Sequence, residues 1–268
     1  MNSGYPLAGY GAMIRDEGRM DAYVEAMRQC IRSDSILLDI GAGPGIMALI
    51  AAQLGARQVV AIEPDPSIRL VRRLSHANGF ADRISARQEL SVHTELKERA
   101  DIIVSDLHST LPLFSGHIPS IVDARTRLLK PGGILIPYAD RIYVAVAEAP
   151  LHYERISNPW RRNRFDLDLE LVSEIESNRI SKAYFSEQAL VSEPQVAFNL
   201  DYRSIEARTL EKTINGSVLR RCTVHGFALW FDSTLIPGVE MTNRPGSRQL
   251  IYGQAFFPIL KPIDLDEG

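Results

Sequence analysis

The glycine-rich segment at residues 36–45 constrains the fold of this chain more than any other part of the sequence. The apolar run Ile36-Leu37-Leu38-Asp39-Ile40 is followed by the turn Gly41-Ala42-Gly43-Pro44-Gly45. Residues 46–55 are apolar, rich in alanine and free of proline, which predicts a helix. Strand, glycine turn and helix form the first unit of a nucleotide-binding α/β fold, in which glycines let a ligand lie against the backbone.

A second apolar run, residues 58–62, ends in another acid, Glu63. A carboxylate at the tip of the second strand is placed to accept hydrogen bonds from both hydroxyls of a ribose. The third glycine of a dinucleotide motif would fall at position 46, which Ile46 occupies, and Pro44 lies inside the turn. This argues against an NAD(P) site. Asp39 has two open interpretations, a ligand contact or a carboxylate that caps the turn.

The rest of the first half continues the α/β pattern, whereas the second half changes in character. Further strands are predicted at 84–88, 100–106 and 134–136, with helices at 11–31, 66–79 and 121–129. From Asp140 onward, runs such as 141–146 and 223–231 alternate in the manner of strands, and no helix of α/β type separates them. The sequence therefore predicts a Rossmann-like α/β domain followed by a mostly antiparallel β domain.

The composition excludes several classes of protein. The chain has 268 residues and a formal net charge of −3, so its bulk charge gives no reason to expect a nucleic acid or an anionic membrane as partner. Its two cysteines, Cys30 and Cys222, are far apart, and no disulfide framework or metal site is expected. No apolar run approaches the roughly 20 residues of a membrane span, and the first residues do not read as a signal peptide. We expect a reduced cytoplasmic protein.

Several motifs together resemble those of the protein arginine methyltransferase (PRMT) family, a branch of the class I S-adenosylmethionine (SAM) methyltransferases. They cover nearly the whole chain. They are residues 13–19 with Tyr23, 38–46, 55–63, 129–133, 135–137 and 225–232, together with Trp160 and 165–166.

The resemblance implies a SAM-binding domain over residues 1–137 and an antiparallel β-barrel domain over 138–268. A helical arm at about 151–190 would pair two subunits into a homodimer. By position, Arg19 would hold the SAM carboxylate, Met13 would lie near the sulfonium, and Gly41 and Gly43 would approach the methionine portion. Glu63 would hold the ribose. Apart from the resemblance, Gln88 and Glu89, after the third strand, have two open interpretations, a contact with the adenine or a surface role.

The acceptor side departs from the family. The two glutamates that hold the acceptor guanidinium in the family fall on Asp106 and on the uncharged Ser115. The family's threonine-histidine-tryptophan loop falls near 250–252, where no histidine stands. Asp106 and His108 are therefore our candidates for catalysis, Asp106 to orient the acceptor and His108 to take its proton.

These departures leave three functions open. We expect a methyltransferase acting on nitrogen or oxygen of a small-molecule or peptide acceptor other than peptidyl-arginine, since a guanidinium stays protonated and one short acid holds it poorly. The first alternative is an arginine N-methyltransferase with an altered loop. The second is an inactive SAM-binding interaction module.

Overall fold

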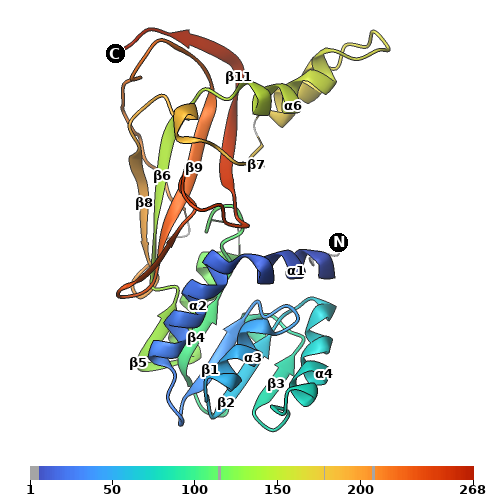
Figure 1. Cartoon of the computed structure of the whole chain (residues 1–268), viewed down its shortest axis with the longest axis vertical. Coiled ribbons are helices and arrows are strands. Elements are labelled where there is room, and N and C mark those ends of the chain that lie inside the picture. Colours follow the sequence, from blue (N-terminus) through green and yellow to red (C-terminus); the bar gives the residue numbers. More distant parts are fainter. Residues whose placement is uncertain (1–5, 114–115, 178, 207–208) are drawn as a thin grey trace.

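The computed structural model describes residues 6–113, 116–177, 179–206 and 209–268. It contains two sheets stacked end to end, with the N-terminal helices between them (Figure 1). The change from one sheet to the other falls between Ile136 and Ala139. One hydrophobic core continues across both, because it includes Leu135 of the first sheet and Ile142 and Phe231 of the second.

The first sheet is parallel and has the strand order β3-β2-β1-β4-β5. Its strands are β1 (Ile36–Ile40), β2 (Gln58–Ile62), β3 (Ile84–Arg87), β4 (Ala100–Ser105) and β5 (Leu129–Ile136). Helices α3 (Ile46–Gln53), α4 (Arg69–Ala77) and α5 (His117–Arg127), with the 3₁₀ turns Pro66–Ile68 and Ser91–His93, connect them. The order reverses at β1, between β2 and β4, and ligands bind in the crevice at such a point.

The N-terminal segment forms two helices where the sequence predicted one. Helix α1 (Leu7–Arg15) ends before Asp16, and α2 (Glu17–Cys30) begins after it. The Asp16 carboxylate accepts a hydrogen bond from the Arg19 backbone N–H at 3.1 Å, so it caps α2. The prediction of one continuous helix over 11–31 was therefore wrong at Asp16. The apolar periodicity continues across this residue, but its capping side chain begins a new helix there.

The second sheet is antiparallel, with the order β7-β11-β9-β6-β8 and with β10 paired to β9. Its strands are β6 (Ala139–Ala147), β7 (Ser181–Ala183), β8 (Gln195–Asp201), β9 (Cys222–Ile236), β10 (Val239–Thr242) and β11 (Gln254–Leu265), with a 3₁₀ turn at Glu187–Ala189. The predicted fold class, a Rossmann-like domain followed by antiparallel β, is confirmed. Within the described ranges no pairing joins the edge strands β7 and β8, so closure of a barrel stays a prediction.

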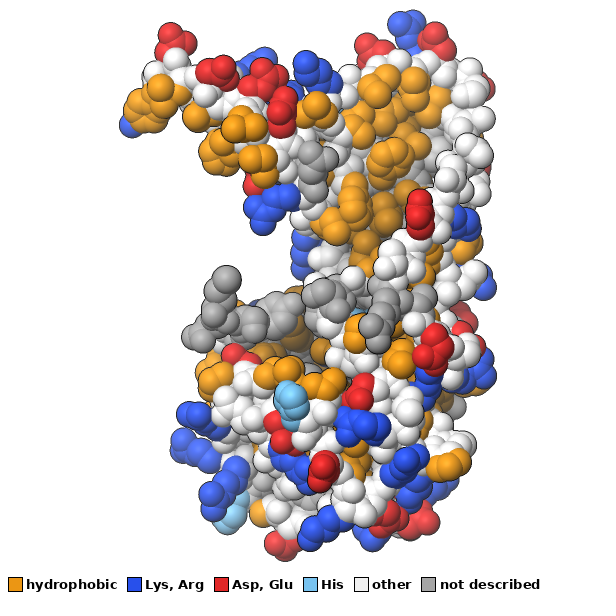
Figure 2. All heavy atoms as spheres, turned by 180° about the vertical axis from the view of Figure 1, so that it is seen from behind, with side chains coloured by type: hydrophobic (Ala, Val, Ile, Leu, Met, Phe, Trp, Pro, Cys, Tyr) orange, Lys and Arg blue, Asp and Glu red, His pale blue; other side chains and the backbone are white. Residues whose placement is uncertain are grey.

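Helices α6 (Pro150–Arg161) and α7 (Glu170–Glu176) project from the second sheet as an arm (Figure 1). Apolar side chains gather on this arm in the space-filling view (Figure 2). The exposed large apolar residues of the arm include Leu151, Phe165, Leu167, Leu171 and Ile175.

Candidate functional site

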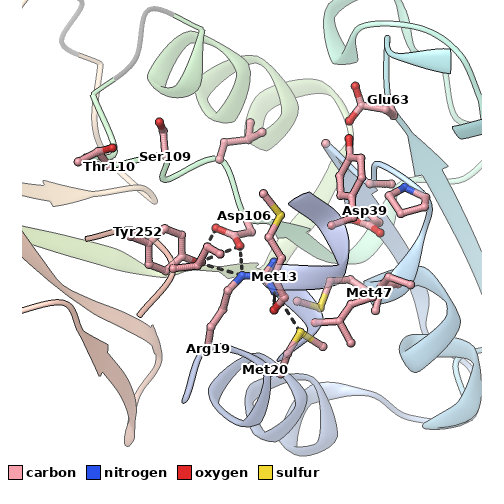
Figure 3. Close-up of a pocket in the computed structure, with 18 of the residues that line it drawn as sticks. Met13, Arg19, Met20, Asp39, Met47, Glu63, Asp106, Ser109, Thr110 and Tyr252 are labelled. Atoms are coloured by element: carbon pink, nitrogen blue, oxygen red, sulfur yellow. Dashed lines mark hydrogen bonds and ion pairs between the residues drawn. The ribbon is translucent and has the colours of Figure 1, made fainter. Parts of the chain in front are cut away.

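The candidate site lies at the carboxyl ends of β1, β2 and β4, beneath α1 and the start of α2. A cavity of about 300 Å³ opens there (Figure 3). The strand ends bring together three acids that are far apart in sequence, Asp39, Glu63 and Asp106. The other side chains that line the cavity include Tyr10, Met13, Arg19, Leu107, Lys182 and Tyr252.

The glycine turn after β1 has a backbone that side chains would not tolerate. Gly41 and Gly43 have φ values of +76° and +52°. A Cβ atom on Gly41 would lie 2.6 Å from the Leu107 side chain, and one on Gly43 would lie 2.5 Å from the Tyr10 ring. Glycine is therefore required at both positions for close approach and for positive φ.

Two of the acids are oriented by the backbone around this turn. Glu63 accepts hydrogen bonds from the N–H groups of Gly43, at 3.1 Å, and Asp65, at 2.9 Å. Asp39 is only 3% exposed and accepts a hydrogen bond from the Ala48 N–H of α3 at 3.1 Å. Burial raises the pKa of Asp39 to about 7. Asp39 thus both ties the turn to α3 and lines the cavity, so the two interpretations left open by the sequence are compatible.

Asp106 lies in a cluster with Arg19 and Tyr252, and the three side chains point toward one another (Figure 3). Arg19 Nε donates to Asp106 Oδ2 at 2.5 Å, and the Tyr252 hydroxyl lies 2.8 Å from both carboxylate oxygens. Although burial opposes the charge, Arg19 and His108 hold the pKa of Asp106 well below its usual range. Asp106 is therefore a charged, firmly held carboxylate.

His108 lies behind Asp106 and does not line the cavity. Its ring is fully buried and stacks on Phe231 of β9. Nδ1 lies 3.1 Å from Asp106 and Nε2 lies 3.1 Å from Asp140 of β6. Both ring nitrogens are thus occupied by carboxylates.

Gln88 and Glu89 also lie outside the residues that line the cavity. Gln88 accepts from Arg69 Nε at 3.1 Å and donates to the Pro64 carbonyl at 3.2 Å, while Glu89 accepts from the Thr94 hydroxyl at 3.0 Å. An adenine contact by either residue stays a prediction. Ser115, the second position of the family's glutamate pair, lies outside the described residues.

The sequence missed two aromatic residues of the site. Tyr252 is buried, and its hydroxyl reaches Asp106. A buried tyrosine needs a hydrogen-bond partner for its hydroxyl, and this was the available signal. Tyr10 covers Gly43 from α1, and no pattern in the sequence marked it.

Two negative findings apply to the described part of the chain. It holds no group of three or more histidine, cysteine or acidic side chains arranged to bind a metal ion. None of its helices combines the length and the apolar character needed to span a bilayer.

Comparison with known proteins identifies methyltransferases. Residues 21–139 match the family model of ribosomal protein L11 methyltransferase (PrmA). The chain is 28% identical to probable protein arginine N-methyltransferase 6 of Arabidopsis thaliana over 229 residues, 82% of this chain and 52% of that protein. It is 25% identical to protein arginine N-methyltransferase 6 of Xenopus laevis over 270 residues, 95% of this chain and 79% of that protein. The chain thus spans about half the length of some of its curated relatives.

The fold agrees with these matches. The PRMT1 enzyme-prozyme heterotetrameric complex of Trypanosoma brucei with AdoHcy aligns over 100% of this chain and 86% of that one, with a TM-score of 0.87 and 21% identity. This alignment covers both sheets of the chain, so the two-sheet architecture is shared with that structure. In sequence and in fold, the chain therefore resembles the arginine methyltransferases, a branch of the class I SAM-dependent methyltransferases.

Proposed function

We propose that this chain transfers a methyl group from SAM to an arginine guanidinium. The residues of the cavity fit the cofactor: Gly41 brings the backbone to the cavity wall, Glu63 is oriented for a ribose, and Arg19 offers a cation for a carboxylate. Met13 lines the same cavity. When bound, SAM supplies an electrophilic methyl group on its sulfonium.

The ion pair between Arg19 and Asp106 carries the assignment of arginine as acceptor. Nε of the Arg19 guanidinium donates to this carboxylate at 2.5 Å, so Asp106 is placed to bind a guanidinium from the cavity side. Tyr252 and His108 hydrogen-bond the Asp106 carboxylate and hold it in place, which compensates for its short side chain. The curated relatives named as arginine methyltransferases also favour this alternative over the non-arginine acceptor expected from the sequence.

The test is methyl transfer to a matched pair of peptides. Purified protein is incubated with methyl-labelled SAM and either an arginine-containing peptide or the same peptide with lysine in place of arginine. We expect label only in the arginine peptide, recovered as methylarginine after acid hydrolysis. Label in the lysine peptide, or in small molecules alone, would restore the acceptor expected from the sequence.

A second candidate, an inactive subunit that binds SAM and regulates a partner, is favoured by one observation. Both oxygens of Asp106 already accept hydrogen bonds from side chains of the chain itself, Arg19 and Tyr252. An acceptor must displace or share one of these donors. SAM binding by calorimetry without turnover of any peptide would support this candidate.

We also propose that the protein forms a homodimer and that the arm, α6 to α7, provides the contact between the two subunits. It presents Leu151, Leu171 and Ile175 to solvent at 74%, 69% and 54% exposure, which leaves an apolar face without cover. Substituting Leu171 and Ile175 with serine is expected to convert a dimer into a monomer in sedimentation experiments. A wild-type protein that sediments as a monomer would remove the proposal.

A further inference from the structure

Behind the cavity, four buried charged groups of alternating sign run from α2 into the second sheet. Arg19 donates to Asp106 Oδ2, and Asp106 Oδ1 lies 3.1 Å from His108 Nδ1. His108 Nε2 in turn lies 3.1 Å from Oδ2 and 3.2 Å from Oδ1 of Asp140. Because Asp106 follows β4 and Asp140 belongs to β6, this row of charges links the two sheets.

His108 can donate to both carboxylates only as a cation. A neutral imidazole carries a single N–H, so one of the two acids would face a lone pair. Burial by itself lowers the pKa of His108, but Asp140 and Asp106 outweigh burial and raise the pKa to about 10. The ring is therefore an imidazolium at neutral pH.

The other groups around the ring leave this charge in place. The Tyr23 hydroxyl of α2 lies 3.4 Å from Nδ1, and the Ser233 hydroxyl of β9 lies 3.3 Å from Nε2. The ring of Tyr252 lies 5.6 Å away between centroids. His117 of α5 lies 6.1 Å away, and burial lowers its pKa to about 4, so it is neutral. Arg19, a permanent cation, lies on the other side of Asp106, at Oδ2, whereas His108 lies at Oδ1.

We propose that His108 is a positioning residue: anchored by Asp140, its imidazolium holds the Asp106 carboxylate toward the acceptor side of the cavity. This inference rests on the proposed function, in which Asp106 receives the acceptor guanidinium. It differs from the general base expected from the sequence, because an imidazolium has no lone pair for a proton and the ring does not line the cavity. The second sheet thereby helps to position Asp106 through Asp140, although Asp140 does not itself line the cavity.

The test uses Asp140→Asn, which removes the anchoring charge and keeps the shape of the side chain. The imidazole ¹⁵N resonances of His108 should show a doubly protonated ring up to about pH 9 in the wild type and a lower pKa in the variant. In the variant, kcat/KM for the arginine peptide should fall as pH rises through that lowered pKa. By pH 8 the loss should be at least about tenfold, the scale of one charge-assisted hydrogen bond.

Two measurements separate positioning from general damage to the fold. The KM for SAM should not change, since Glu63 and the glycine turn are not involved. Asp201→Asn, at a partly exposed acid on the neighbouring strand β8, is the matched control and should behave as the wild type. A crystal structure of Asp140→Asn at pH 8 should show the Asp106 carboxylate displaced from its wild-type position.

A wild-type His108 that titrates below pH 7 overturns the proposal, as does an Asp140→Asn variant with the wild-type pH profile and Asp106 position. If Asp140→Asn does not fold, His108→Asn replaces it. That variant keeps a neutral donor toward Asp106 but loses the contact with Asp140. If the Asp106 carboxylate keeps its wild-type position in the crystal structure of this variant, the proposal is likewise overturned. The spectra and crystal structures need no acceptor, so they test the positioning role of His108 even if arginine peptides are not methylated. Absence of methylation would contradict only the proposed function.

Discussion

The backbone N–H of Gly43 donates a hydrogen bond of 3.1 Å to the carboxylate of Glu63. The two residues lie at the ends of adjacent parallel strands, β1 and β2. A second donor, the Asp65 N–H, holds the other carboxylate oxygen at 2.9 Å. The glycine turn and the acid therefore form one preorganised unit, and a ligand that meets one also meets the other.

Glu63→Ala is expected to weaken SAM binding by about 10- to 100-fold, since it removes a charged partner for the ribose hydroxyls. Calorimetric titration with SAM measures the change. Glu98→Ala is the control, because Glu98 is an exposed acid paired with Arg57 and Lys130 and does not line the cavity. Equal affinities of the two variants would contradict the assignment of Glu63 to the cofactor.

Asp106→Asn is expected to abolish methyl transfer while SAM still binds, because Arg19 loses a competing partner. The same change leaves the Arg19 charge buried, with 7% of the residue exposed, and should lower the free energy of unfolding by about 3–5 kcal/mol. Denaturant unfolding and calorimetry measure the two effects. Asp123→Asn breaks a more exposed pair with Arg127 and should cost less than about 1 kcal/mol. Retained turnover would remove Asp106 from the catalytic residues.

Tyr252→Phe should lower kcat/KM for the acceptor by about tenfold through loss of one hydrogen bond to a charged group. The affinity for SAM should stay within experimental error. The comparison is Tyr184→Phe, at an exposed tyrosine whose ring contacts Lys182. A Tyr252→Phe enzyme as active as Tyr184→Phe would mean that Arg19 and His108 suffice to hold Asp106.

The buried Asp39 should make stability depend on pH. Its pKa is raised to about 7, above the 3.8 of an unperturbed aspartate, so the folded protein binds this proton more tightly than the unfolded chain. The stabilisation is fully present below pH 3.8 and is lost as pH rises through about 7. Asp39→Asn cannot ionise, so its stability relative to the wild type should increase by about 2–3 kcal/mol between pH 5 and pH 8. Urea unfolding at both pH values measures this difference, and a constant difference would contradict it.

Gly43→Ala combines backbone strain with a clash, because its Cβ would lie 2.5 Å from the Tyr10 ring. We expect displacement of α1 and loss of SAM binding, measured by protease cleavage within residues 7–15 and by calorimetry. Gly132→Ala is the matched control, since its φ of +75° carries similar strain but nothing lies within 4 Å of the added atom. Both variants should lose about 1 kcal/mol of stability from strain. Only Gly43→Ala should lose SAM affinity, and equal affinities would contradict the role of the turn.

The sequence by itself determined the local geometry of the cofactor side. Positive φ at Gly41 and Gly43 and the strand ends at Asp39 and Glu63 follow from backbone sterics and from short-range apolar patterns. Parallel strands then bring their carboxyl ends to one edge without any further information. These properties are local or repeat along the chain, so they can be predicted from the sequence without the tertiary structure.

Only the tertiary structure decided the acceptor side. Arg19 and Asp106 are 87 positions apart, and Tyr252 is 233 positions from Arg19, yet the three side chains meet. The two nitrogens of His108 lie against Asp106, just after β4, and Asp140 of β6, and no local pattern encodes that contact between the sheets. The charge state of a buried histidine depends on which groups surround it, and packing between the two sheets alone chooses those groups.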